Sequence, residues 1–377
     1  MNLLSLPNEI LIIIINHLKL DDVIKLSKMN DKLFDLTKYY NRFEIGSNYL
    51  ESLVFLKHLK KIEYFADMDT SYHSYYIKYA KKLNLNHLKS IKLNYCSCLS
   101  TDNLREFILN NNNLQELVLD DQNSLESHQL SLILNKCKNL VNLSLLNTKV
   151  NSYNLSVLNP NMQKLLLYNC VNIDSTSIGL FNFPELKELA LNNCSIYSDI
   201  LLAKIFKKLP KLEKINLSST YVSYFTIREI IKNCPNINCL NLSTNYGNIS
   251  NFHSILITDK FTNLVYLNLS FSSITDCAVS AMVKKLKVIK YLYLSYTYIK
   301  EISAFRLLTS FPTLEYFSVD GTSIFSNYLL KNIYYYGDNF KYIQFETKNL
   351  NYSLFNKILS KYPKLYLNWN LPTVQFN

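Results

Sequence analysis

The chain has 377 residues, of which 48% are hydrophobic, and its formal net charge is +11 at pH 7. No apolar run approaches the ~20 residues that a membrane-spanning helix needs, so we expect no such helix. Lysines occur singly or in pairs such as Lys207-Lys208, without long runs of like charge. A solvated surface therefore explains the positive charge better than a nucleic-acid-binding face.

The first predicted element is a helix within SLPNEILIIIINHLKLDD, residues 5–22. Pro7 suits the first helical turn, where its missing N–H costs nothing. Helical spacing divides the apolar residues between two sides, with Ile10, Ile14 and Leu18 on one and Leu11 and Ile15 on the other. A small domain can cover only one of these sides. The other side predicts a contact with the rest of the chain or with a second protein.

Two further short helices are predicted before residue 43. Asp21-Asp22 reads as a helix cap and an acidic first turn. Apolar residues then follow at helical spacing, and a third helix carries its own apolar set: Val23, Leu26, Met29 and Leu33, then Phe34, Leu36 and Tyr40. The three helices together predict a compact trio.

This N-terminal segment resembles the F-box family. The matching motifs are Leu6-Pro7-Asn8-Glu9-Ile10-Leu11, Ile14 through Leu18, Asp21-Asp22-Val23-Ile24 and Leu26-Ser27-Lys28-Met29. Met29 replaces the usual Val, Leu33 replaces the usual aromatic residue, and the closing Trp is absent, with Tyr39, Tyr40 and Phe43 as candidates for its place.

In the F-box family, the apolar helices dock on a Skp-type adaptor that links to a cullin ubiquitin ligase. The resemblance implies that nine residues contact this adaptor: Leu6, Pro7, Ile10, Leu11, Ile14, Leu18, Val23, Leu26 and Met29. The alternative is an ordinary helical cap that packs on the first repeat.

From residue 59 onward, the pattern apolar-x-x-apolar-x-apolar recurs about every 25 residues. Its first members are Leu59, Leu88, Leu114, Leu140, Met162, Leu186, Leu212, Ile237, Leu264, Ile289, Leu314 and Phe340, with a partial copy at Leu365. The alternation predicts a short strand with one buried face, and stretches such as residues 102–113 have helical spacing. One strand and one helix cannot close a core, so we expect stacked copies in parallel.

This pattern resembles the leucine-rich repeat, in its cysteine-containing subtype. Ile274-Thr275-Asp276 and Cys137-Lys-Asn-Leu140 match that subtype's additional motifs. A small polar residue or cysteine also follows each strand: Cys96, Thr148, Cys170, Cys194, Thr220, Asn245, Ser272, Thr297 and Thr322. We expect these side chains to hydrogen-bond buried loop backbone, which would otherwise cost free energy.

The sequence offers no catalytic or metal-binding constellation. The histidines are isolated, and the five glycines nearly exclude a phosphate-cradling loop. Cys96-Ser97-Cys98 has no second ligand pair, so we expect no zinc site. We expect the eight cysteines to be reduced.

Aligned repeats form columns on the predicted exposed strand face. Tyrosines occupy one column in four successive repeats, with a fifth beside it: Tyr266, Tyr291, Tyr316 and Tyr342, and Tyr293. Tyrosine is enriched at binding hot spots, so this column is the candidate target-binding site. The alternative is that stacked tyrosines only reinforce the strands. Earlier repeats carry mixed charge instead, at Lys61, Glu63, Lys92, Glu116, Asp120, Lys164 and Glu188.

We therefore predict an α/β leucine-rich-repeat solenoid, a horseshoe with parallel strands on the concave face and helices on the convex face, after a small all-α F-box. The predicted domains are a three-helix F-box at 1–43, a linker or degenerate capping repeat at 44–58, and about twelve repeats at 59–377.

By resemblance, the chain is the substrate-recognition subunit of a Skp-cullin-F-box-type ubiquitin ligase. We expect it in the cytoplasm or nucleus, of a host cell if the source is a virus. It would bind a target protein and need no catalytic residue, cofactor or metal. The alternatives are an interaction scaffold or inhibitor that recruits no ligase, and a nucleic-acid-binding solenoid with salt-dependent affinity.

Overall fold

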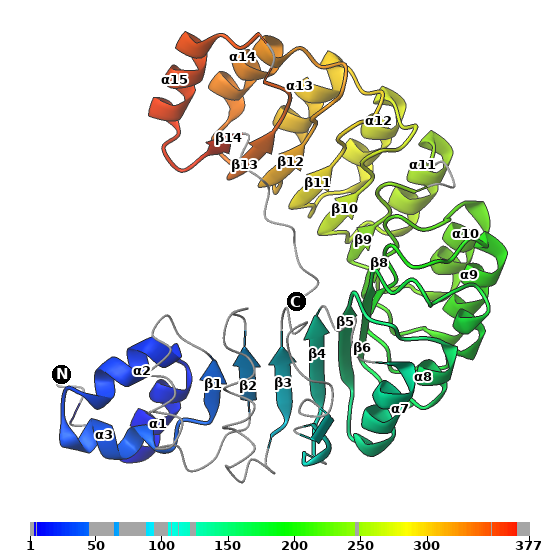
Figure 1. Cartoon of the computed structure of the whole chain (residues 1–377). Helices are drawn as coiled ribbons and strands as arrows, with labels where there is room; N and C mark the ends of the chain where they lie inside the picture. The colour runs from blue at the N-terminus through cyan, green and yellow to red at the C-terminus, as the bar shows by residue number, and fades with distance from the viewer. Residues whose placement is uncertain are drawn as a thin grey trace. The chain divides into compact units, whose positions relative to one another are not determined.

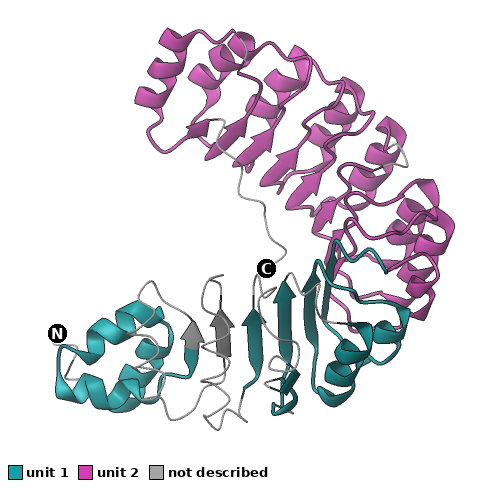
Figure 2. Cartoon of the chain, viewed as in Figure 1, with its two compact units in different colours: residues 1–172 teal, residues 173–377 magenta. Residues whose placement is uncertain are grey.

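The computed structural model divides into two compact units, residues 1–172 and 173–377 (Figure 2). The described residues are 4, 6–44, 64–67, 88–93, 105–106, 108–111, 113–120, 126–245, 249–347 and 349–367. Among them, no helix is both long and apolar enough to cross a membrane. The first unit joins the N-terminal helices to the earlier repeats, and the domain boundaries at residues 43 and 58 stay a prediction.

The N-terminal trio consists of α1 (Asn8–Asn16), α2 (Leu20–Ser27) and α3 (Asp31–Thr37). Its buried apolar side chains come from all three helices and the segment after them: Leu11, Ile15, Leu20, Val23, Ile24, Leu33, Leu36 and Tyr40. The Tyr40 hydroxyl donates to the Leu18 carbonyl oxygen at 3.1 Å, which ties the end of the trio to the end of α1. The predicted three-helix arrangement is confirmed.

Parallel strands continue the first unit, paired in chain order (Figure 1). They are β1 (Arg42–Glu44), β2 (Tyr64–Asp67), β3 (Ser90–Leu93), β4 (Glu116–Asp120), β5 (Asn142–Leu146) and β6 (Lys164–Tyr168). The helices α7 (Ser127–Lys136) and α8 (Ser152–Ser156) follow β4 and β5. Alternate strand residues such as Leu117, Leu119, Leu143 and Leu145 are fully buried, as the repeat pattern predicts.

The second unit repeats the same strand–helix alternation. Its strands are β7 (Glu188–Ala190), β8 (Lys214–Asn216), β9 (Cys239–Asn241), β10 (Tyr266–Asn268), β11 (Tyr291–Tyr293), β12 (Tyr316–Ser318), β13 (Tyr342–Gln344) and β14 (Tyr366–Leu367). Its helices are η3 (Ser177–Leu180), α9 (Asp199–Ile205) with η4 (Phe206–Lys208), α10 (Tyr224–Asn233), α11 (Asn251–Lys260), α12 (Asp276–Lys285), α13 (Glu301–Ser310), α14 (Ser326–Tyr336) and α15 (Tyr352–Lys361). The strands are parallel, and within this unit the helices lie along one face of the sheet (Figure 1).

Small polar side chains close the turns after several strands of the second unit. The hydroxyls of Thr220, Ser272 and Thr297 donate to the carbonyl three residues earlier, at 2.5, 2.5 and 2.6 Å. Asn245 accepts from the Val222 N–H at 2.7 Å and donates to the Leu217 carbonyl at 3.2 Å. The predicted role of these residues in satisfying buried loop backbone is confirmed at these positions, while Cys96 lies outside the described residues.

The strand exits share a left-handed backbone residue. Positive φ values of 52–62° occur at Asn147, Asn169, Asn193, Ser219, Thr244, Phe271, Tyr296 and Gly321. The N–H of this residue donates to the next repeat, as from Phe271 to the Ser295 carbonyl at 2.8 Å and from Tyr296 to the Asp320 carbonyl at 2.7 Å. Asn and Gly tolerate this conformation, whereas it is a strained one for Phe and Tyr.

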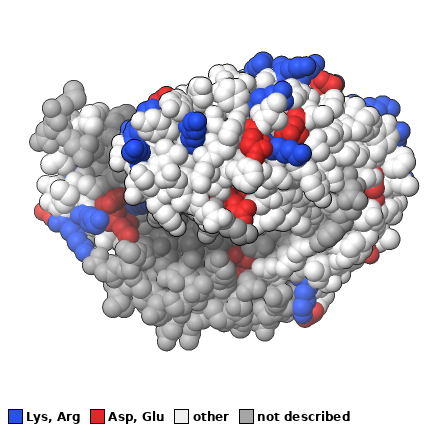
Figure 3. All heavy atoms as spheres, turned by 90° about the horizontal axis from the view of Figure 1, so that it is seen from above, with Lys and Arg blue, Asp and Glu red and all other residues white. Residues whose placement is uncertain are grey.

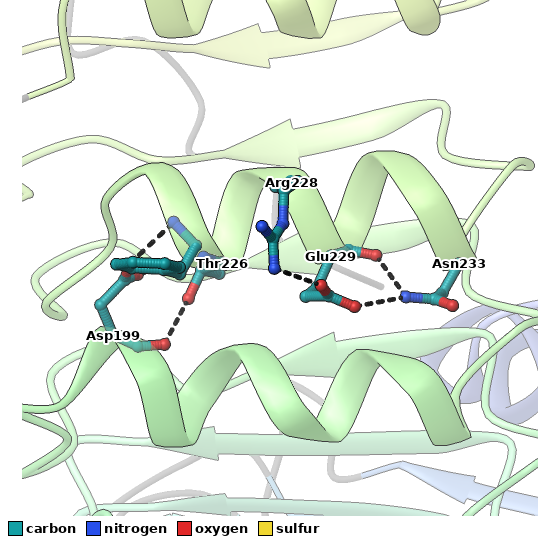
Figure 4. A network of polar contacts seen from close by, with 6 residues as sticks. Asp199, Thr226, Arg228, Glu229 and Asn233 are labelled. Atoms are coloured by element: carbon teal, nitrogen blue, oxygen red, sulfur yellow. Dashed lines mark hydrogen bonds and ion pairs between the residues drawn. The ribbon is translucent and has the colours of Figure 1, made fainter.

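A buried carboxylate links the helices of neighbouring repeats. Asp199, in the first turn of α9, accepts hydrogen bonds from the N–H groups of Ser223, Phe225 and Thr226 at 2.8, 3.0 and 3.3 Å. It thereby caps α10, whose N-terminal N–H groups have no partner within the helix. The Thr226 hydroxyl returns a bond to the Asp199 carbonyl at 3.1 Å (Figure 4).

Glu229 forms a second polar cluster on α10 (Figure 4). Burial by itself would raise the pKa of Glu229, but hydrogen bonds from Arg228 and Asn233 outweigh it, and the pKa lies below its usual value. The two bonds measure 3.0 and 3.1 Å. The Asp199 cluster thus links α9 to α10, whereas the Glu229 cluster lies within α10.

Candidate protein-binding surfaces

Helix α1 has one buried and one exposed apolar side. Leu11 and Ile15 are 1% and 2% exposed, whereas Ile10 and Ile14 are 44% and 36% exposed. The predicted division of this helix into two sides is confirmed, and the trio itself covers only one of them. Ile13 is also exposed, which widens the uncovered apolar side. Ile13 lies three residues after Ile10, and this helical spacing indicates in the sequence that both residues lie on the same side of the helix.

The nine residues of the predicted adaptor contact separate into three groups. Pro7, Ile10, Ile14 and Met29 are exposed, and Leu6, Leu18 and Leu26 are half-buried. Leu11 and Val23, in contrast, are buried inside the trio, and this corrects their assignment to a contact surface. Their side chains are needed for the core, because a trio this small has few other apolar residues to fill it. Phe34 and Tyr39 are exposed apolar residues that the prediction did not include.

The predicted tyrosine column forms a continuous ladder across β10–β14. The parallel register pairs Tyr266 with Tyr291, Tyr291 with Tyr316, Tyr316 with Tyr342, and Tyr342 with Tyr366. We call these five residues the tyrosine ladder. Tyr366 was missed because it follows Leu365 directly, whereas the other members lie two residues after their apolar partner.

Most rings of the tyrosine ladder stack face to face. The centroids of Tyr291 and Tyr316 are 4.5 Å apart with 18° between the planes, those of Tyr316 and Tyr342 are 5.0 Å apart, and those of Tyr342 and Tyr366 are 4.8 Å apart. Tyr266 is tilted by 40° against Tyr291, at 6.2 Å. Each stacked face is therefore occupied by the next ring, which leaves edges and hydroxyl groups for a partner.

Exposure along the ladder differs from the prediction of a uniformly exposed column. Tyr291, Tyr316 and Tyr342 are half-buried, and only Tyr366 is exposed. Tyr266 and Tyr293 are 6% and 9% exposed, because their rings pack against each other at 5.4 Å beneath the neighbouring tyrosines. Burial raises the pKa of Tyr266 to about 12 and raises that of Tyr293 further.

Asparagine and serine columns lie beside the ladder on β8–β10. Asn216 accepts hydrogen bonds from the N–H and hydroxyl of Ser218 at 3.0 and 2.9 Å, and Asn241 accepts the same pair from Ser243. These Asn-x-Ser segments form side-chain-supported turns that end the strands. Their side-chain oxygens are therefore engaged within the fold.

Charged residues in the other repeats pair between adjacent strands. Lys92 lies 3.0 Å from Glu116, and Lys214 lies 2.6 Å from Glu188. Lys61 and Glu63 lie outside the described residues. On the face drawn in Figure 3, basic and acidic side chains are interspersed with uncharged surface. The described surface there offers no large patch of one sign.

The strand-to-helix edge of the second unit carries a further exposed apolar surface. It includes the second residue of several helices and the loops before them: Tyr197, Ile200, Tyr221, Phe225, Phe252, Phe271, Tyr296, Tyr298, Ile302 and Phe325. From the sequence, only Phe271 and Tyr296 were placed at the strand exits, because the other residues of this edge lie at the ends of periodic segments. Phe271 and Tyr296 stack at 4.4 Å within it.

No group of three metal-ligating side chains occurs among the described residues. Burial raises the pKa of the Cys137 thiol to about 11 and that of the Cys234 thiol to about 12. Thiols so difficult to ionise are poor nucleophiles. Cys96, Cys98, His58, His73 and His87 lie outside the described residues.

The chain matches no protein-family model, and no curated protein resembles it significantly in sequence. In fold it is similar to a chain of the crystal structure of the Rad7 and Elc1 complex in yeast, with a TM-score of 0.62 and 16% identity over 96% of this chain and 92% of that chain. An internalin (inlF) of Listeria monocytogenes matches with a TM-score of 0.48 and 14% identity, over 83% of this chain and 91% of that chain. The predicted α/β leucine-rich-repeat solenoid is confirmed by the architecture and the first of these matches.

Proposed function

We propose that the chain is the substrate-recognition subunit of a Skp-cullin-F-box-type ubiquitin ligase. Its N-terminal helices would hold the Skp-type adaptor, and its repeats would hold a target protein. The observation that carries this proposal is the exposed apolar side of α1, formed by Ile10, Ile13 and Ile14 next to the Leu6-Pro7 motif.

An uncovered apolar side on a small folded trio favours a second protein as its cover. Burial of apolar surface contributes roughly 25 cal/mol per Å², so three isoleucines and Met29 would together stabilise such a contact substantially. The four side chains are all at least a third exposed, and Met29 is 72% exposed. The similar yeast fold was solved as a complex of Rad7 and Elc1, which is consistent with assembly onto a partner.

The tyrosine ladder is the proposed contact for the target protein. It lies on the strand face of the second unit, where Tyr291, Tyr316 and Tyr342 are half-buried and Tyr366 is exposed. Tyrosine supplies a large contact area and a hydroxyl group at a low entropic cost. A specific interface buries about 800 Å² on each partner, which several adjacent repeats can provide.

The second candidate function is a repeat scaffold that binds a protein but recruits no ligase. The same ladder supports it, since target binding needs no adaptor. The two functions differ only in the role of the exposed side of α1.

Co-purification of the full chain with a Skp-type adaptor and a cullin tests the proposal. Ile10→Asp with Ile14→Asp should abolish capture of the adaptor, because two charges would then be buried in the contact. Lys25→Asp, on the exposed side of α2, is the matched control and should retain capture. Unchanged capture by the double variant would contradict the assignment of this surface. No capture by the wild-type chain would favour the scaffold.

A further inference from the structure

One hydroxyl group beside the tyrosine ladder has no hydrogen-bond partner among the described residues. The Tyr293 hydroxyl is closed off from solvent and makes no hydrogen bond within the part of the chain that the structure describes. Tyr293 as a residue is 9% exposed. A buried polar group without a partner is costly, and native proteins retain few of them. Because the Tyr293 hydroxyl lies beside a proposed binding surface, a bound ligand could supply the missing acceptor.

The surroundings keep this hydroxyl protonated. Burial, and then the proximity of the Tyr266, Tyr291 and Tyr316 hydroxyls, raise the pKa of Tyr293. A protonated hydroxyl in this setting can donate to a carbonyl or carboxylate oxygen. Because the hydroxyl is covered, an acceptor would reach it when a neighbouring side chain moves aside.

The stacked rings also decide which contacts the ladder can make. Bases of single-stranded nucleic acids bind by stacking on aromatic faces. The faces of Tyr316 and Tyr342 are already occupied on both sides by neighbouring rings, at 4.5 to 5.0 Å. Ring edges, which carry partial positive charge, and hydroxyl groups remain for a partner. Both attract groups rich in negative charge.

Charges around the ladder favour an acidic partner at the start of the strands. Lys290 precedes Tyr291 and is exposed, with no ion pair among the described residues. Lys341 precedes Tyr342, pairs with Glu315 at 2.6 Å and lies 6.0 Å from the Tyr316 ring. The acidic residues Asp320 and Glu346 lie beyond the other end of β12 and β13. The net charge of +11 adds a long-range attraction for anionic partners.

We propose that the tyrosine ladder binds an extended acidic peptide segment of the target protein, with the hydroxyl of Tyr293 as the buried donor to one carboxylate and Lys290, at the start of the strand, as a counter-ion for the segment's negative charge. This inference rests on the target-binding role proposed above and adds the chemistry of the ligand. It assigns the binding energy to hydroxyl donors rather than to apolar contact area.

Selection of randomised peptides displayed on phage, with the immobilised full chain as bait, tests the inference. Wild-type protein should enrich peptides rich in Asp and Glu. Tyr293→Phe and Tyr291→Phe keep the rings but remove the hydroxyls, and each should weaken binding of a selected peptide about tenfold. Tyr352→Phe, at an exposed position on α15, is the control and should bind as wild type does.

A stability measurement separates binding from folding. Tyr293→Phe removes an unpartnered buried hydroxyl, so its denaturant midpoint should stay equal to that of the wild type or rise. Lost binding together with an unchanged or higher midpoint supports a ligand-directed hydroxyl. If both Phe variants bind selected peptides as tightly as the wild type, the hydroxyl assignment is overturned.

Further outcomes distinguish this inference from the proposed function. Selected peptides that bind both Phe variants as tightly as the wild type, but no longer bind Tyr291→Ala, would overturn the hydroxyl mechanism. The ladder would then remain an apolar target site. If the selected peptides also bind Tyr291→Ala as tightly as the wild type, or if the selection enriches no peptide, the ladder is not the target site. Binding of oligodeoxythymidine that is lost with Tyr291→Ala would overturn the peptide ligand in favour of nucleic acid.

Discussion

The ring of Tyr296 lies directly over the α-carbon of Gly321. A β-carbon at position 321 would come within 2.5 Å of Cδ1 and Cε1 of that ring, closer than real β-carbons approach other atoms. Gly321 also has a φ of +62°, which side chains rarely adopt. The repeat therefore uses glycine here because two independent constraints exclude a side chain. Together they let Tyr296 extend the stack that begins at Phe271.

Gly321→Ala should lower the free energy of unfolding by about 1–3 kcal/mol, through backbone strain and displacement of the Tyr296 ring. Chemical denaturation of the full chain measures this change. Gly179→Ala is the matched control, because a β-carbon added there would meet no atom within 4 Å and the backbone is not left-handed. That variant should be neutral or slightly stabilising. Equal effects at both positions would contradict the account of Gly321.

Leu217→Ala and Leu269→Ala should each cost about 2–5 kcal/mol, by lost packing and a residual cavity. Both leucines are fully buried on the core side of their strands. Leu132→Ala, at a 50% exposed position of α7, should change stability by less than about 0.5 kcal/mol. Denaturant midpoints of the three variants provide the comparison. A near-zero change at Leu269 would show that the strand register is wrong.

Tyr291→Ala and Tyr316→Ala should weaken target binding about tenfold or more, as truncation of a central hot-spot residue does. Adaptor capture should stay unchanged, because neither residue belongs to the N-terminal trio. Affinity for a selected peptide and the unfolding midpoint should be measured together. If the midpoints fall while affinity is retained, the ladder serves to reinforce the strands, and the target site lies elsewhere, for example on the apolar strand-to-helix edge.

Asp199→Ala should destabilise the second unit by about 2–3 kcal/mol, because it removes the side chain that accepts hydrogen bonds from the N-terminus of α10. The carboxylate is 8% exposed and accepts bonds from three backbone N–H groups. Asp259→Ala removes a carboxylate that pairs with Lys285 at 3.1 Å on the surface, and should cost about 0–1 kcal/mol. Similar losses in thermal unfolding at both sites would argue against the capping role.

Asp174 should add a pH-dependent contribution to stability. Hydrogen bonds from the backbone and hydroxyl of Ser177, and then from Thr176, lower its pKa from 3.8 to about 2. A group whose pKa is lowered in the folded state stabilises fully above its unfolded pKa, and the contribution disappears as the pH falls through the folded pKa. The stability difference between wild type and Asp174→Ala should therefore shrink between about pH 4 and about pH 2. A difference that stays constant over this window would contradict the prediction.

Local sequence patterns were sufficient to predict the repeat and the buried side of its strands. Apolar residues at fixed spacing dictate which side of each strand is buried, and the small polar residue after each strand follows from the need to satisfy loop backbone. The same local reasoning divided α1 into two apolar sides and aligned Tyr266, Tyr291, Tyr316 and Tyr342 in one column. These features depend on positions a few residues apart, or one repeat apart.

Which of the aligned groups are accessible depends on packing between elements and could not be read from the sequence. Leu11 and Val23 fill the core of the trio, and Tyr266 and Tyr293 are buried beneath their neighbours, because side-chain packing across elements determines exposure. The capping role of Asp199 and the place of Tyr366 in the ladder likewise depend on atoms from different repeats. Periodicity fixes the direction in which a residue points, whereas the surrounding side chains fix whether it meets solvent, a partner or the core.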